Sequence, residues 1–258
     1  MGVEVQYRRD VPTQDLDYLE AITKHSEGFA SSAEGNLVAM VEHCPGWSVA
    51  DLVAHLTDVH WFWAKIVDER LSSPPDESTR PARANDDRLI ERFRSGAHHL
   101  VEVLERAPDD ASVWTWSPVQ RDVAFVARHQ VQEAAVHHWD AAHAAGKPLT
   151  LEATLADDAV AEFLTFSVAS EADPADPAPT ALGRAFVITS TDCRTSWTVA
   201  DGPRPGTLSV SEGASPEDPM ISAPASDLLL WLYRRVDVDP ASVPAAVIER
   251  FRAFTFTD

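Results

Sequence analysis

The sequence predicts a four-helix bundle over residues 1–150, followed by a small α+β domain over residues 151–258. The first observation is that apolar residues recur at helical spacing in four segments of the N-terminal half, with breaking residues between them. The second is that the C-terminal part changes to short alternating segments separated by turn residues. Four amphipathic helices with one or two long connections are typical of a bundle, and the mixture that follows is typical of an α+β domain.

The four N-terminal helices have recognisable limits in the sequence. Ser48 and Asp51 have the spacing of a capping box, and Trp47 can pack over the first turn of the second helix. Pro108 ends the third helix, and Gly146 ends the fourth in the manner of a C-terminal cap. The predicted helices span residues 16–42, 49–71, 86–107 and 123–145.

The C-terminal domain is expected to begin with a helix and to continue with strands. An acidic, proline-rich segment at residues 171–180 reads as a loop or linker. Phe186 and Ile188 share one strand face, and so do Trp197 with Val199 and Leu208 with Val210. The predicted helices of this domain lie near residues 155–170, over 226–236 and from 244 onward.

Composition excludes several classes of protein. Acidic residues number 41 against 21 basic ones, for a formal charge of −20, which disfavours binding to nucleic acid or to anionic lipid. Cys44 and Cys193 are the two cysteines, so a disulfide scaffold is not expected. The sequence has no membrane-spanning apolar run and no signal-peptide core, and a cytoplasmic protein is the plain interpretation.

The histidines suggest a metal site in the bundle. His129, Glu133 and His137 are each four residues apart, so they follow one stripe of the fourth helix, with Asp140 on roughly the same side. Imidazole nitrogen and carboxylate oxygen are ligands of Zn²⁺, and bundles build metal sites from facing helices. His55 of the second helix, with Glu133 and His137, would supply three ligands and leave one coordination position open.

Other interpretations stay open at this point. A glutamate and a histidine four residues apart are often only an exposed polar pair, and a single helical histidine is often structural. His129 is the rival third ligand, although three successive turns of one helix hardly converge on one ion. Cys44 lies in a Pro-Gly turn before a helix, where a thiolate could be stabilised, but a buried small apolar side chain is the simpler role.

Three motifs carry a resemblance to a known family. They are CPGWSVADLVAHL at residues 44–56, HQVQEAAVHHWD at 129–140 and SDLLLWLYRRV at 226–236. In this order they resemble the actinobacterial maleylpyruvate isomerase family of mycothiol-dependent enzymes, over nearly the whole chain. The resemblance implies a DinB-like N-terminal bundle and a sterol-carrier-like α+β C-terminal domain.

The resemblance also implies ligands and an active-site residue. The family binds a divalent metal, usually zinc, and its ligands fall on His55, Glu133 and His137. A family arginine falls on Arg235, where it would hold a substrate carboxylate, while Arg234 stands where the family pattern has glycine. The alternative for Arg235 is a cation favoured by the end of a helix.

The implied function is a metal-dependent reaction that uses mycothiol as thiol cosubstrate, with cis–trans isomerisation like that of maleylpyruvate isomerase. A thiolate would add to a carbon–carbon double bond, and expulsion after rotation would give the trans isomer. One alternative is a mycothiol S-transferase, and another is a non-catalytic metal- or ligand-binding bundle. The expected partners are a small-molecule substrate and a low-molecular-weight thiol, and monomer and homodimer both stay open.

Overall fold

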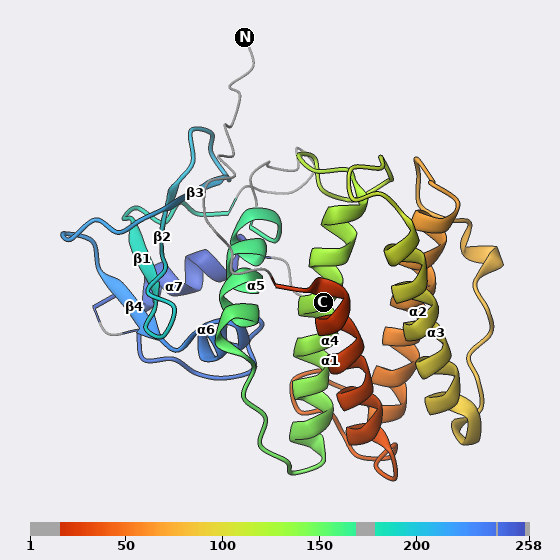
Figure 1. Cartoon of the computed structure of the whole chain (residues 1–258). Helices are drawn as coiled ribbons and strands as arrows, with labels where there is room; N and C mark the ends of the chain where they lie inside the picture. The colour runs from red at the N-terminus through yellow and green to blue at the C-terminus, as the bar shows by residue number, and fades with distance from the viewer. Residues whose placement is uncertain (1–15, 169–178, 241, 256–258) are drawn as a thin grey trace.

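The computed structural model describes residues 16–168, 179–240 and 242–255. Figure 1 shows a helical bundle on one side and a small sheet on the other, with helix α5 between them. The predicted fold class is confirmed, because a helical N-terminal part precedes an α+β C-terminal part. The helices are α1 (Tyr18–Ala33), α2 (Val49–Asp68), α3 (Asp86–Arg106), α4 (Val123–Ala144), α5 (Ala153–Phe166), α6 (Ala225–Leu232) and α7 (Ala245–Arg252), with a short 3₁₀ turn at Glu77–Thr79.

The first helix is shorter than predicted. It ends at Ala33 rather than near residue 42, and the backbone N–H of Glu34 donates the last helical bond to Ala30. Gly35 then adopts a φ of +73°, a left-handed conformation that stops the helix and that glycine reaches without steric cost. The following residues form a looped connection, closed by a β-bridge between Met40 and Ser48.

The start of α2 is built as predicted. Ser48 is the N-cap, its side chain accepts from the backbone of Asp51, and the Asp51 carboxylate accepts from the backbone N–H of Ser48 at 3.0 Å. Such a reciprocal pair satisfies two backbone donors that a helix start leaves free. The capping box therefore sets where α2 begins, and it places His55 in the second turn.

The helices α1 and α4 approach each other closely at Gly28. The imidazole of His138 occupies the space where a side chain of residue 28 would be, since a Cβ there would lie 2.2 Å from His138 Cε1. The Nδ1 atoms of His25 and His138 are 3.2 Å apart on the same side of this contact. Glycine at position 28 thus allows the neighbouring helix to present a histidine ring to α1.

The sheet has four strands in the order β3-β2-β1-β4. Neighbours β3, β2 and β1 are antiparallel, whereas β4 runs parallel to β1 and pairs Ile221 with Ile188. The strand β4 was not predicted, because its four residues are too few to show an alternating pattern. The strands are β1 (Phe186–Ser190), β2 (Ser196–Asp201), β3 (Leu208–Glu212) and β4 (Met220–Ala223).

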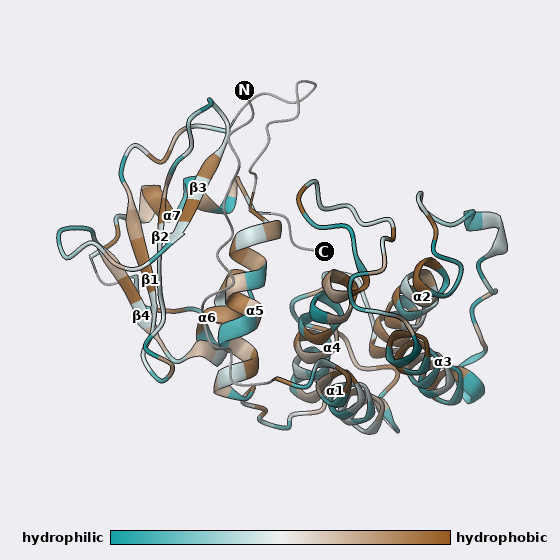
Figure 2. Ribbon diagram, turned by 45° about the horizontal axis from the view of Figure 1, so that its top comes forward, coloured by the Kyte–Doolittle hydropathy of each residue, from teal (hydrophilic) through white to brown (hydrophobic). Residues whose placement is uncertain are grey.

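One apolar core joins the two parts of the chain. It includes Leu100 and Phe125 of the bundle, Phe163 of α5, Phe186 of the sheet and Trp231 of α6, all at most 4% exposed. Figure 2, coloured by hydropathy, shows apolar stretches in the bundle helices, in α5 and in the strands. Within this core α6 packs against α5 and α5 packs against α4, so burial of apolar surface, the main stabilising term, connects α6 to the bundle through α5.

Two further predictions concern the proline-rich segment and membrane-spanning helices. Most of the acidic, proline-rich segment predicted as a loop lies outside the described residues, which resume at residue 179. Among the described helices, none combines the length and the apolar composition that crossing a membrane requires.

Candidate metal centre

The structure brings together the three ligands that the sequence suggested. His55 projects from α2, and Glu133 and His137 project from α4, with one potential ligand atom of each within 4.8 Å of the others. Glu133 Oε1 lies 3.4 Å from His55 Nε2 and 3.5 Å from His137 Nε2. Ligands about 2.1 Å from a tetrahedral zinc ion are about 3.4 Å from each other, so these separations suit a shared ion.

The burial of the cluster also suits an ion. Glu133 is 9% exposed and His137 is 5% exposed. His55 Nε2 is buried and has no hydrogen-bond partner, because its 3.4 Å contact with Glu133 is not aligned for a hydrogen bond. A buried polar atom without a partner is costly, and coordination to an ion would satisfy it. Two imidazole nitrogens and one carboxylate oxygen therefore fit a divalent metal.

Helical geometry explains why these side chains meet. Residues four apart lie on one face of a helix, so Glu133 and His137 point in the same direction from α4. The imidazole of His55 approaches from α2 and packs edge-on against that of His137, with ring centroids 5.3 Å apart. The indole of Trp47 also packs beside the His55 ring, with ring centroids 5.0 Å apart.

The charged groups of the cluster shift the pKa values of Glu133 and His137 strongly. Burial alone would raise the pKa of Glu133, but the neighbouring imidazoles of His137 and His55 outweigh it and hold that pKa well below its usual value. Burial alone would lower the pKa of His137, but the carboxylates of Asp140 and Glu133 raise it to about 9. At neutral pH Glu133 is therefore a negative carboxylate and the His137 imidazole carries a second proton, which a bound metal would displace.

A fourth residue of α4 continues the cluster. Asp140 Oδ2 lies 3.0 Å from His137 Nδ1, on the side of the ring away from Glu133. Sequence reasoning placed Asp140 on this side of the helix but gave it no role. The signal that could have found it is the three-residue spacing to a candidate metal ligand, because ligating histidines commonly donate their second N–H to a carboxylate.

Arg235 reaches this carboxylate from the C-terminal part. Its Nε and Nη2 donate to the two oxygens of Asp140 at 3.1 and 2.9 Å, and its Nη1 donates to the carbonyl of Tyr233 at 2.7 Å. Nη2 also lies 3.6 Å from Cys44 Sγ, and Arg235 is only 6% exposed. The guanidinium is therefore next to the cluster and is bound to Asp140. A catalytic role for it stays a prediction.

The end of α6 explains how Arg235 is aimed. The N–H of Arg234 donates to Trp231 and the N–H of Arg235 donates to Leu230, which is the Schellman pattern of helix ends. Arg234 has a φ of +63°, the left-handed conformation that this motif normally gives to glycine. The backbone therefore turns here as a glycine would turn, although the residue is arginine.

The remaining sequence candidates lie outside the cluster. His129 Nδ1 is 3.0 Å from Glu162 Oε1 of α5, so it is engaged elsewhere and is not the third member of the group. Both cysteines are free, as expected. Cys44 is partly buried, and burial, with a contribution from Asp140, raises the pKa of its thiol to about 11.

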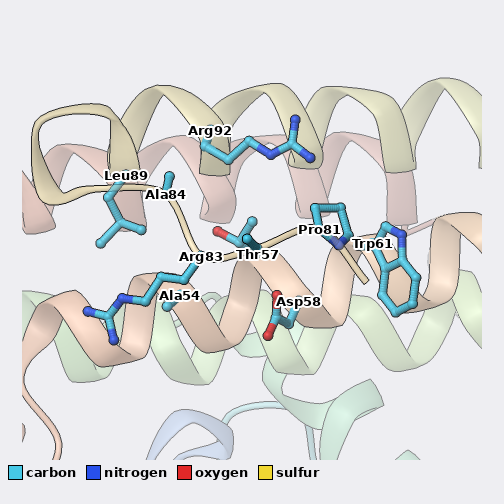
Figure 3. A pocket seen from close by; sticks show the side chains of 10 residues that line it. Ala54, Thr57, Asp58, Trp61, Pro81, Arg83, Ala84, Leu89 and Arg92 are labelled. Carbon is cyan, nitrogen blue, oxygen red and sulfur yellow. The ribbon is translucent and has the colours of Figure 1, made fainter. Parts of the chain in front are cut away.

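A second group of potential ligands and a small pocket both lie apart from this cluster. Glu42, His43 and His143 form a second group of potential ligands, but Glu42 and His143 are exposed and already 2.9 Å apart in a hydrogen bond. Figure 3 shows a small pocket between α2, α3 and residues 81–84, lined in part by Trp61 and Arg92. Its α2 residues include Ala54, and His55 points about 100° away around the helix. The pocket is therefore not part of the metal cluster.

The fold and the cluster define a class of protein in which a helical bundle with a two-histidine, one-glutamate group is joined to a small α+β part. Sequence profiles make the family specific. The mycothiol maleylpyruvate isomerase N-terminal domain matches residues 19–142, and the MDMPI C-terminal domain matches residues 154–249. The chain belongs to the mycothiol-dependent maleylpyruvate isomerase family, as the resemblance implied.

Solved structures agree with this fold. The crystal structure of the mycothiol-dependent maleylpyruvate isomerase matches with a TM-score of 0.60 and 12% identity, covering 88% of this chain and 91% of that one. A mutant of that enzyme matches with a TM-score of 0.57, at the same identity and coverage. A search of the curated proteins finds no match. At this identity the structural likeness shows the fold.

Proposed function

We propose that the protein is a divalent-metal-dependent enzyme that uses mycothiol on a small electrophile, with cis–trans isomerisation like that of maleylpyruvate isomerase. The observation that carries the proposal is the group of His55, Glu133 and His137, with the buried, unpartnered Nε2 atom of His55 and with Glu133 Oε1 3.4 and 3.5 Å from the two imidazoles. Membership of the family and the fold shared with a mycothiol-dependent maleylpyruvate isomerase support it. Zinc is the metal that this donor set suits best.

The three side chains of the cluster would bind the metal and leave room for the thiol. The imidazoles of His55 and His137 and the carboxylate of Glu133 would hold the ion and leave one position for sulfur. A bound zinc ion would supply the positive charge that keeps a thiol deprotonated at neutral pH. The low exposure of Glu133 and His137 would limit competition from water at the cluster.

The proposed isomerisation needs no oxidant or reductant, because the substrate and the thiol keep their oxidation states. The sulfur of mycothiol adds to one carbon of a cis double bond conjugated to a carbonyl, and the electron pair moves to the carbonyl oxygen. Rotation about the new single bond follows, and return of the electron pair expels the sulfur and restores the double bond in the trans form. Arg235 lies beside the cluster, and its positive charge is paired with the carboxylate of Asp140.

Metal content and turnover test the proposal together. We expect the untagged wild-type protein to bind zinc, and Glu133→Gln and His55→Ala to lose it. His143→Ala is the matched control, because it removes a histidine from the exposed group and leaves the proposed site intact. Zinc retained by His143→Ala and absent from Glu133→Gln would support the assignment, and the reverse would overturn it.

Turnover then distinguishes the reactions. Zinc-loaded protein with mycothiol and maleylpyruvate should form the trans isomer, which a direct absorbance assay follows. Consumption of mycothiol with generic electrophiles, without isomerisation, would point instead to the S-transferase alternative. Zinc binding with no turnover of any electrophile would favour a non-catalytic metal-binding protein.

A further inference from the structure

Asp140 is the most enclosed charged group beside the candidate metal centre. It is 1% exposed, and its carboxylate oxygens contact Arg235, His137 and, at 4.0 Å from Oδ2, the Cys44 Sγ. Oδ1 accepts from Arg235 Nε, and Oδ2 accepts from Arg235 Nη2 and faces His137 Nδ1 at 3.0 Å. An ionised carboxylate at this depth is stable only when such partners compensate the loss of water.

The contact determines which nitrogen of His137 carries a proton. A carboxylate can only accept hydrogen bonds, so the proton of a neutral His137 lies on Nδ1, between the ring and Asp140. The lone pair is then on Nε2, which is the atom that faces Glu133 at 3.5 Å. Rotation of the ring would break the 3.0 Å contact, so Asp140 also fixes the direction in which the lone pair points.

Arg235 fixes Asp140 in turn, and it does so from another part of the chain. The two residues are 95 positions apart, and the guanidinium binds both carboxylate oxygens in a planar, two-point contact. The Schellman end of α6 sets the direction of this side chain, and α6 packs against α5, which packs against α4 of the bundle. A continuous series of contacts thus connects the C-terminal part to the imidazole of His137.

We propose that Asp140 is a positioning residue that presents Nε2 of His137 to the metal, and that Arg235 acts on the site through Asp140. This inference rests on the proposed metal-dependent function and adds to it that some residues bind the metal and others position the ligands. Arg235 would then tune how tightly the ion is held, in place of the direct contact with a substrate carboxylate that the family resemblance implied. The difference between these two roles is measurable.

The experiment compares zinc affinity in variants that each lose one charged group of a buried ion pair, with a matched control. Asp140→Asn keeps the shape of the side chain and should weaken zinc binding roughly 10–100-fold, the usual effect of losing the carboxylate partner of a ligating histidine. Arg235→Met should weaken it in the same direction but less. Asp158→Asn is the matched control, because Arg128 of α4 binds Asp158 of α5 with two contacts of 2.9 Å, away from the metal cluster.

A spectroscopic measurement separates positioning from a general loss of stability. In zinc-loaded wild-type protein, long-range ¹H–¹⁵N spectra should show the His137 proton on Nδ1 and the metal on Nε2. In Asp140→Asn this signature should weaken or exchange between the two nitrogens. If Asp140→Asn fails to fold, the wild-type spectrum and Arg235→Met still decide the question.

The outcomes are distinct for the two proposals. No zinc binding by wild-type protein would overturn the proposed function itself. Zinc binding by wild type, with unchanged affinity in Asp140→Asn or a His137 proton on Nε2, would overturn the positioning role alone. Unchanged zinc affinity in Arg235→Met, with a raised KM and unchanged kcat, would show that Arg235 contacts the substrate directly.

Discussion

Replacing Gly28 by alanine should destabilise the protein, although alanine is the better helix former. A helix interior gains about 1 kcal/mol when glycine becomes alanine. At this position the new methyl group would lie 2.2 Å from His138 Cε1 and 2.6 Å from its Nε2, whereas ordinary contacts are about 3.5–4.0 Å. The ring would have to retreat by more than about 1 Å.

The surroundings of His138 oppose that retreat. Its ring packs edge-on against that of His25, with centroids 5.3 Å apart and Nδ1 atoms 3.2 Å apart. Overpacking of this kind costs about 1–3 kcal/mol, which exceeds the gain in helix propensity. We therefore expect Gly28→Ala to lower the free energy of unfolding by about 1 kcal/mol.

The assay is urea unfolding, followed by circular dichroism, in two backgrounds. When His138 is first replaced by alanine the space beside residue 28 opens, and Gly28→Ala should become stabilising by about 1 kcal/mol. The coupling between the two positions is then about 2 kcal/mol, well above the error of additivity. The same effect of Gly28→Ala in both backgrounds would refute the close contact of α1 and α4 at this residue.

Two further predictions concern His60 and Arg234. Burial lowers the pKa of His60 to about 4, below the value of 6.5 for an ordinary histidine. The unfolded chain therefore binds a proton more readily, and the free energy of unfolding falls as the pH drops from 6.5 toward 4. Urea unfolding should show His60→Phe losing about 2 kcal/mol less than wild type between pH 7 and pH 5, and equal losses would contradict this. At the left-handed position 234, Arg234→Gly should be about 1 kcal/mol more stable than Arg234→Ala, since both lack the side chain and only glycine is free of the backbone cost. Thermal denaturation measures the difference, and equal midpoints for the two variants would speak against it.

The fold was largely accessible from the sequence, because its signals are local. The capping box of Ser48 and Asp51 and the apolar periodicity of the bundle helices follow from neighbouring residues, and the structure shows both. The end of α1 was misplaced because apolar residues continue past Gly35 into the connection that follows. The strand β4 was missed because four residues hold too little pattern, and its parallel pairing with β1 is a tertiary contact.

The candidate site was accessible in part for the same reason. The four-residue spacing of Glu133 and His137 could be recognised in the sequence. His55 could be added to them because bundle metal sites use facing helices and because of the family resemblance. The pairing of Asp140 with Arg235 could not be found in this way, because the two residues are 95 positions apart and meet only in the folded chain. The metal role of the three ligands stays a prediction that the zinc measurements test.

The close succession of Glu133, His137 and Asp140 along α4 has a consequence for how the protein can vary. An α-helix turns by about 100° and advances 1.5 Å with every residue. One inserted residue between Glu133 and His137 would therefore move the imidazole, and every residue after it, to another face of the helix. The imidazole would then lie away from the Glu133 carboxylate and from α2. This stretch should therefore tolerate exchange of its outward-facing residues but no change of length, and insertions in related chains should fall in the connections on either side of it.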